Sequence, residues 1–138
     1  MNRRLWVACA LVVSLVCLAG CGGKGVKTGT VYGKVTVDGQ PLVEGTINFN
    51  ALDGNTPTSG GKITNGSYSV AVPRGVQKVL ISSPRVKSTR KAYDTPDSAL
   101  INEYEETLLD EYTNPFQTPL SVDVNSGSVN KDFEVKKR

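Results

Sequence analysis

The sequence predicts an all-β domain, a sandwich of seven short strands with a single short helix in one long insertion. Two patterns carry this prediction. Short stretches alternate between apolar and polar side chains, which is typical of strands with one buried face. Gly, Asn, Asp and Pro residues separate these stretches, as tight turns require. One domain with a leader fits a chain of 138 residues, and strands in this number are typical of two packed sheets.

The first 20 residues predict an export signal. Arg3-Arg4 precedes an apolar stretch over residues 5–20, which is shorter than the roughly 20 residues of a transmembrane helix. Residues 18–21 (LAGC) resemble the lipobox of bacterial lipoproteins. That resemblance implies a lipoprotein signal peptide over residues 1–20, cleavage before Cys21, and acylation of the Cys21 thiol by chains such as palmitate. The alternatives are an uncleaved anchor or a cut at another site.

Residues 21–29 are predicted to form a flexible tether, because glycine-rich segments behave as coil. The domain that follows, residues 30–138, is therefore expected close to a membrane of the cell envelope. Gly22 follows the lipidated position, which resembles the pattern of outer-membrane lipoproteins and favours the outer membrane over the inner one. Cys9 and Cys17 leave with the signal peptide, so the mature domain has neither a free thiol nor a disulfide.

Seven alternating stretches predict the strands of the domain. Asp38-Gly39 and Asn65-Gly66 supply turns that accept positive φ, and Asn-Gly between two alternating stretches is a strong hairpin signal. Residues 51–61 are rich in turn formers. The predicted strands span residues 31–37, 46–50, 62–64, 67–72, 76–82, 120–124 and 129–136.

The apolar positions of these strands predict the core. Residues two apart share a face of a strand, so the apolar set defines the buried face. Lys131 shares its face with Phe133 and is expected at the rim. The residues expected to be buried between two sheets are Val35, Ile47, Phe49, Tyr68, Val70, Val79, Ile81, Val122 and Phe133.

Residues 83–118 interrupt this alternation and form the long insertion. A loop of this length without structure is uncommon in a compact domain, so we expect a helix over 97–112. Thr95-Pro96-Asp97 is typical of a helix start. The apolar residues that follow at helical spacing are Leu100, Ile101, Tyr104, Leu108 and Tyr112. We expect residues 85–114 to be accessory to the fold, because a long surface connection adds little closure entropy.

The same insertion holds two blocks of opposite charge. These blocks either pair with each other or form a charged docking surface for another envelope component. The basic block contains Arg85, Lys87, Arg90 and Lys91, and the acidic block contains Glu103, Glu105, Glu106, Asp110 and Glu111.

Three segments resemble a known family. Residues 33–49 (GKVTVDGQPLVEGTINF) and 64–68 (TNGSY) are similar to the opening of carboxypeptidase regulatory-like domains. Residues 112–124 (YTNPFQTPLSVDV) resemble the ending of small bacterial lipoproteins built on this domain. The resemblance implies a transthyretin-like or immunoglobulin-like sandwich of seven strands without catalytic residues of its own. It does not account for the insertion over 83–118.

The composition excludes several classes of function. The chain has no His, which removes the usual catalytic dyads and the commonest zinc ligand. A formal charge of +3 is too small to indicate a nucleic-acid partner. Asp53-Gly54-Asn55 lacks the spaced carboxylates of a calcium loop and is expected to be a turn. The sequence therefore predicts no catalytic residue, no cofactor site and no metal site.

We expect a non-enzymatic sandwich, held to a membrane by lipid on Cys21, that binds or scaffolds an envelope protein or glycan. One alternative is a carbohydrate-binding module, with Tyr32, Tyr68 and Tyr93 as its aromatic surface, although Tyr68 is expected in the core. The other alternative is a transthyretin-like hydrolase. That family uses histidines and a Tyr-Arg-Gly-Ser C-terminus, whereas this chain ends in VKKR.

Overall fold

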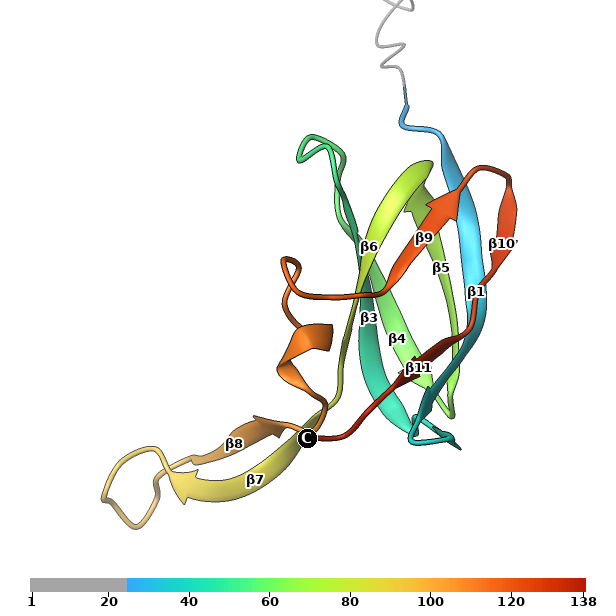
Figure 1. Ribbon diagram of the computed structural model, residues 1–138. Coiled ribbons are helices and arrows are strands. Elements are labelled where there is room, and N and C mark those ends of the chain that lie inside the picture. Colours follow the sequence, from blue (N-terminus) through green and yellow to red (C-terminus); the bar gives the residue numbers. More distant parts are fainter. Residues whose placement is uncertain (1–24) are drawn as a thin grey trace, which may run out of the picture.

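A computed structural model describes residues 25–138 (Figure 1). The predicted signal peptide, the lipobox and Cys21 lie outside the described residues. Within 25–138 the chain is all-β, as predicted, and helical structure is limited to the short 3₁₀ helix η1 (Asp110–Tyr112). In this part of the chain, no helix has the length and apolar character needed to cross a membrane.

A strand is observed in each of the seven predicted stretches, although Leu120 and residues 131, 132 and 136 lie outside the observed strands. The predicted strand 129–136 is divided into two, and three strands were not predicted, namely β2, β7 and β8. The strands are β1 (Thr28–Val37), β2 (Gln40–Pro41), β3 (Glu44–Ala51), β4 (Ser59–Thr64), β5 (Ser67–Pro73), β6 (Gly75–Ser82), β7 (Pro84–Lys91), β8 (Leu100–Glu106), β9 (Ser121–Val124), β10 (Ser128–Asn130) and β11 (Phe133–Val135).

The main sheet has the order β10-β1-β5-β4-β3-β6-β9, and β2 and β11 also pair with β1. Its pairs are antiparallel except for β1 with β10 and β1 with β11, which are parallel. The sheet curls, so that β1 and β5 lie across the core from β3 and β6 (Figure 1). The rings of Phe49 in β3 and Tyr68 in β5 meet there, with centroids 6.3 Å apart.

The burial of the predicted core residues is confirmed, although they lie inside one curled sheet and not between two separate sheets. All nine residues expected to be buried are buried, and Phe49, Ile47 and Ile81 have no exposed surface. Lys131 is exposed, as expected for a position at the rim. The alternating pattern therefore assigned the buried face of each of these strands correctly.

Both predicted turns are confirmed by their backbone angles. Asp38 and Gly39 have φ of 49° and 81°, and Asn65 and Gly66 have φ of 49° and 76°. This left-handed pair is what a two-residue hairpin turn requires, and Asn, Asp and Gly adopt it at low cost. The Asp38 turn joins β1 to the short strand β2, while the Asn65 turn joins β4 to β5.

The helix predicted over 97–112 is wrong. Residues 100–106 form β8, which pairs with β7 in a separate two-stranded sheet. Thr95 lies in the turn that connects these strands, where the backbone N–H of Ser98 donates to its carbonyl at 3.2 Å. The basic block supplies β7 and part of the acidic block supplies β8, so their opposite charges meet across strands instead of along a helix.

The expectation that residues 85–114 are accessory is wrong for the segment that follows the hairpin. Leu108 and Tyr112 are buried in the core. Thr118 is also buried, and its hydroxyl donates to the carbonyl of Val79 at 2.7 Å. The chain after β8 therefore returns to the body of the domain, and replacing all of 85–114 would remove core side chains.

Candidate functional site

The hairpin formed by β7 and β8 projects from the body of the domain (Figure 1). Every residue of β7 is exposed, and β8 is exposed up to its last residue, Glu106. Residues that face each other across antiparallel strands share a face, so the register divides the hairpin into two surfaces. The charged face holds Arg85, Lys87, Ser88, Arg90, Ile101, Glu103 and Glu105, and the Tyr104 face holds Val86, Thr89, Lys91, Leu100, Asn102 and Tyr104.

The charged face is held by ion pairs between the two strands. Lys87 Nζ lies 3.5 Å from Glu105 Oε1, and Arg90 Nε lies 2.6 Å from Glu103 Oε1. These contacts confirm that the two blocks pair with each other, at least through these four residues. All four side chains are about half exposed or more, so solvent screens both pairs and each adds little to stability.

The Tyr104 face presents apolar side chains to solvent. Val86 and Tyr104 lie opposite each other near the base, and Leu100 lies nearer the tip. All three are more than half exposed. Exposed apolar groups gathered on one projecting element mark contact surfaces more often than scattered ones do.

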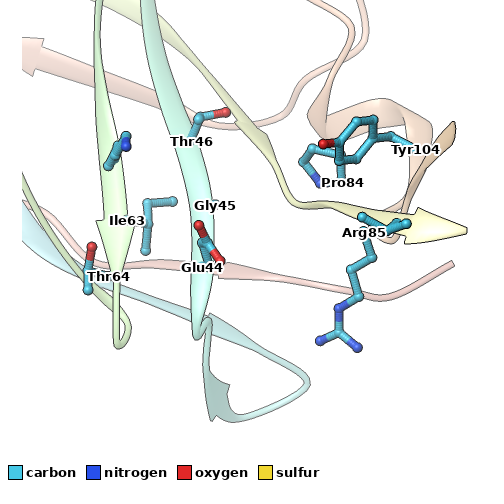
Figure 2. Close-up of a pocket in the computed structure, with 10 residues that line it drawn as sticks. Glu44, Gly45, Thr46, Ile63, Thr64, Pro84, Arg85 and Tyr104 are labelled. Atoms are coloured by element: carbon cyan, nitrogen blue, oxygen red, sulfur yellow. The ribbon is translucent and has the colours of Figure 1, made fainter. Parts of the chain in front are cut away.

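Three hollows surround the base of the hairpin. The first, of about 470 Å³, lies between the Tyr104 face and the outer surface of β3 and β4 (Figure 2). The second, of about 400 Å³, includes Lys87, Glu105 and Lys137 in its lining. The third, of about 170 Å³, reaches the β1–β2 turn region and Leu42. Arg85 lines all three hollows, so it occupies the point where they meet.

Glu106 fixes the base of the hairpin to the main sheet. Its Oε2 accepts a hydrogen bond from the Ser82 hydroxyl, and its Oε1 accepts from the backbone N–H groups of Ser83, Thr107 and Leu108. Burial raises the pKa of Glu106, but these hydrogen bonds to the charged carboxylate lower it by more, so the pKa lies below its ordinary value. The carboxylate is therefore ionised and fully engaged near neutral pH.

The charges around Arg85 are not balanced. Lys87 is paired with Glu105, and Arg138 is paired with Asp110 at 2.8 Å. Both carboxylate oxygens of Glu106 accept hydrogen bonds at the hairpin base. Among the residues that the structure describes, Arg85 and Lys137 form no ion pair, and neither do Lys62 and Glu44 in the first hollow. The linings of the three hollows together hold five cationic side chains and three carboxylates.

The Asp53 loop is a turn, as predicted. Asp53 Oδ1 accepts from the backbone N–H groups of Asn55 at 3.1 Å and Thr56 at 3.0 Å, and Oδ2 accepts from the Thr56 hydroxyl at 2.6 Å. The Thr56 hydroxyl and these backbone groups lower the pKa of Asp53. Over residues 25–138, no group of three or more Cys, Asp or Glu side chains lies together as metal ligands would.

The three tyrosines considered for a sugar-binding surface do not share a face. Tyr68 is buried, its hydroxyl donates to the Lys131 carbonyl at 2.6 Å, and burial raises its pKa. Tyr32 lies in β1, and Tyr93 lies in the connection between β7 and β8. Tyr104, which the sequence placed on a helix, is an exposed aromatic residue that borders the first hollow, and the exposed Tyr32 borders a separate hollow of about 500 Å³ away from the hairpin.

No family model matches the chain, and no curated protein matches it. Among solved structures, the chain is similar to a 9R-lipoxygenase from Cyanothece PCC8801, with 11% sequence identity and a TM-score of 0.41. The matched region covers 77% of this chain but only 16% of the lipoxygenase chain. A likeness this distant assigns neither a family nor an activity.

Proposed function

We propose that this protein is a lipid-anchored component of the bacterial cell envelope, whose non-catalytic β-sandwich binds or scaffolds other envelope components. The observation that supports the proposal is the projecting β7–β8 hairpin. Almost all of its residues are exposed, and three of them, Val86, Leu100 and Tyr104, are large apolar or aromatic residues outside the core. A two-stranded hairpin is marginally stable in water by itself, so this projecting β7–β8 hairpin, called the arm below, is best explained as a contact surface.

The anchor and the arm would lie at opposite ends of the domain. Residue 25, where the described chain begins, leads into the start of β1, and the base of the hairpin lies toward the other end of that strand (Figure 1). Val37, the last residue of β1, lines the same hollow as Arg85. A strand the length of β1 spans roughly 30 Å. With lipid on Cys21, the hairpin would therefore lie on the side of the domain away from the anchor, where a partner can reach it.

The proposed fold is the transthyretin-like sandwich of carboxypeptidase regulatory-like domains. The curled all-β sheet and the Asp38-Gly39 turn are compatible with it. The proposal of a non-enzyme rests on the sequence, which has no His to act as a general base near neutral pH.

Replacing the lipidated cysteine tests the anchored location. Cys21→Ser should leave an unprocessed precursor or release the protein from the detergent phase, because the thiol is the acyl acceptor. Cys9→Ser and Cys17→Ser are matched controls, since they lie in the leader and should mature normally. Membrane fractionation and the mass of the N-terminal peptide report the outcome. A Cys21→Ser protein that still matures and sediments with membranes would contradict the proposal.

A further inference from the structure

We propose that the base of the β7–β8 hairpin binds an acidic, extended peptide segment of the envelope partner, with Arg85 and Lys137 pairing with its carboxylate. This inference rests on the proposed scaffolding function and names the chemistry of the partner. It is carried by the position of Arg85 at the junction of three hollows and by the unbalanced positive charge there.

The charge of the site selects an anion. The guanidinium of Arg85 extends away from the Tyr104 ring, which lies beside Pro84 (Figure 2). Arg85 and Lys137 line two of the hollows together, and within the described residues neither has an ion-pair partner. A guanidinium binds a carboxylate through two parallel hydrogen bonds, and a nearby ammonium adds a second favourable charge.

The apolar lining selects a peptide over a small anion. Val86 and Tyr104 line the first hollow, and Leu42 and Leu108 line the third. A ligand that reaches from Arg85 into both hollows needs apolar groups on each side of its charge. An extended peptide provides this arrangement, because its successive side chains point in opposite directions. A free phosphate or sulfate ion would leave both linings uncovered.

The edges of the hairpin favour an extended conformation of the ligand. β7 and β8 form a two-stranded sheet, so each strand has one edge that faces away from the other. Unpaired strand edges recruit further strands, and peptides bind many domains by adding a strand in this way. A third strand would also stabilise a hairpin that is marginal with two.

The carboxylate of Glu44 should weaken the binding of an acidic ligand, which gives a second way to test the role of charge at this site. It lines the first hollow opposite Arg85 and is exposed, so its carboxylate opposes the binding of a second one. Removing that charge should strengthen the binding of an acidic peptide, whereas it should not affect an uncharged peptide of the same shape.

Peptide binding by the full lipidated protein in detergent tests the inference. The probe is the fluorescent peptide TVEVEVT, capped at both ends, and TVQVQVT is its uncharged control. Fluorescence anisotropy should show that the acidic peptide binds at least tenfold more tightly than the control. Arg85→Gln and Lys137→Gln should each weaken the acidic peptide about tenfold, while Glu44→Gln should strengthen it. Arg90→Gln is the matched control, because Arg90 is already paired with Glu103, and it should change binding less than twofold.

Each other outcome overturns the inference. Equal binding of the two peptides would show that charge does not select the ligand. Displacement of the probe by low millimolar phosphate or acetate would show a small-anion site. An Arg85→Gln protein that loses the peptide but still captures its partner in the envelope would refute this site while leaving the scaffolding function in place. A wild-type protein that captures no envelope partner at all would refute the scaffolding function itself.

Discussion

The hydroxyl of Ser82 donates a hydrogen bond to the carboxylate of Glu106, with Oγ and Oε2 2.5 Å apart. Ser82 ends β6 in the main sheet and Glu106 ends β8 in the hairpin, so this contact joins the body to the arm. Oε1 of the same carboxylate accepts from the N–H groups of Ser83, Thr107 and Leu108 at 2.9, 3.0 and 3.1 Å. One half-buried carboxylate therefore holds the point where the hairpin leaves the domain.

Glu106→Ala should lower the free energy of unfolding by about 1.5–3 kcal/mol, because it leaves several donors without an acceptor. Urea unfolding followed by circular dichroism measures the loss. Glu105→Ala is the matched control, since Glu105 is an exposed neighbour, and it should cost less than about 0.5 kcal/mol. Equal effects of the two substitutions would show that Glu106 does not fix the hairpin base.

The stability of the domain should fall as the pH falls through the pKa of Glu106. The folded-state pKa of Glu106 lies below its unfolded value, which is about 4.3. The stability from this group is therefore complete above that unfolded value and is lost as the pH drops through the folded value. Urea midpoints from pH 7 to pH 3 report the loss.

Other carboxylates contribute in the same direction, so the comparison with a variant isolates Glu106. Hydrogen bonds from Ser88 and Arg90 lower the pKa of Glu103, and Thr56 lowers that of Asp53. The stability difference between the wild type and Glu106→Gln should be constant at neutral pH and should shrink below about pH 4. A difference that stays constant to pH 3 would contradict the assignment.

Phe49→Ala should cost roughly 3–5 kcal/mol, because the ring is fully buried and its removal leaves a cavity beside Tyr68. Leu52→Ala is the control, since Leu52 is mostly exposed in the connection after β3. That substitution should cost less than about 0.5 kcal/mol. Thermal or urea unfolding measures both, and a loss below about 1 kcal/mol for Phe49→Ala would show that the buried face of β3 is wrongly assigned.

Shortening the hairpin should leave a folded domain. Val86 and Tyr104 face each other across the two strands. Replacing residues 87–103 with Asn-Gly would join them by a two-residue turn suited to paired strands. Because the deleted residues are exposed apart from the partly buried Ala92 and Ser98, the free energy of unfolding should change by about 1 kcal/mol or less. The larger replacement of residues 85–114 removes Leu108 and Tyr112 from the core, and it should fail to give a cooperative melt.

Aggregation of the shortened protein is the outcome that would contradict this division between arm and body. Size-exclusion chromatography distinguishes a monodisperse domain from an aggregate. A shortened protein that folds but no longer captures its partner would place the contact surface in the arm.

The sequence predicted the parts of the fold in which one face of each strand is buried. Ile47, Phe49 and Val79 alternate with polar residues, and the period of two fixes which side faces the core. Asn65-Gly66 marked a turn for an equally local reason, since its backbone angles are accessible to few other residue pairs. Both signals depend on neighbouring residues alone.

The hairpin was missed because it has no buried face. Leu100, Ile101, Tyr104 and Leu108 recur at helical spacing, but the first three are exposed and only Leu108 packs in the core. Their spacing therefore reflected no helical face. The order of the charges along the chain could have identified the hairpin. Lys87 pairs with Glu105 and Arg90 with Glu103, so the later cation pairs with the earlier carboxylate, as antiparallel strands require.

The candidate site could not be predicted because it depends on long-range contacts. Arg85 and Lys137 line the same hollows only because the C-terminal segment returns to the end of β8, where the backbone N–H of Arg138 donates to the Thr107 carbonyl at 3.0 Å. No local pattern relates residue 85 to residue 137. The unbalanced charge at the junction of the hollows is therefore visible only in the folded chain.

The central claim is that an arm on a lipid-anchored domain contacts another envelope component, and photo-crosslinking in intact cells tests it most directly. A benzoylphenylalanine at Tyr104, a residue that is 64% exposed, should give a discrete adduct with one envelope component. The same probe at Leu52, which is 63% exposed, should give none. The adduct should also disappear in the Cys21→Ser background. Identical adducts from both positions, or none from Tyr104, would contradict the claim.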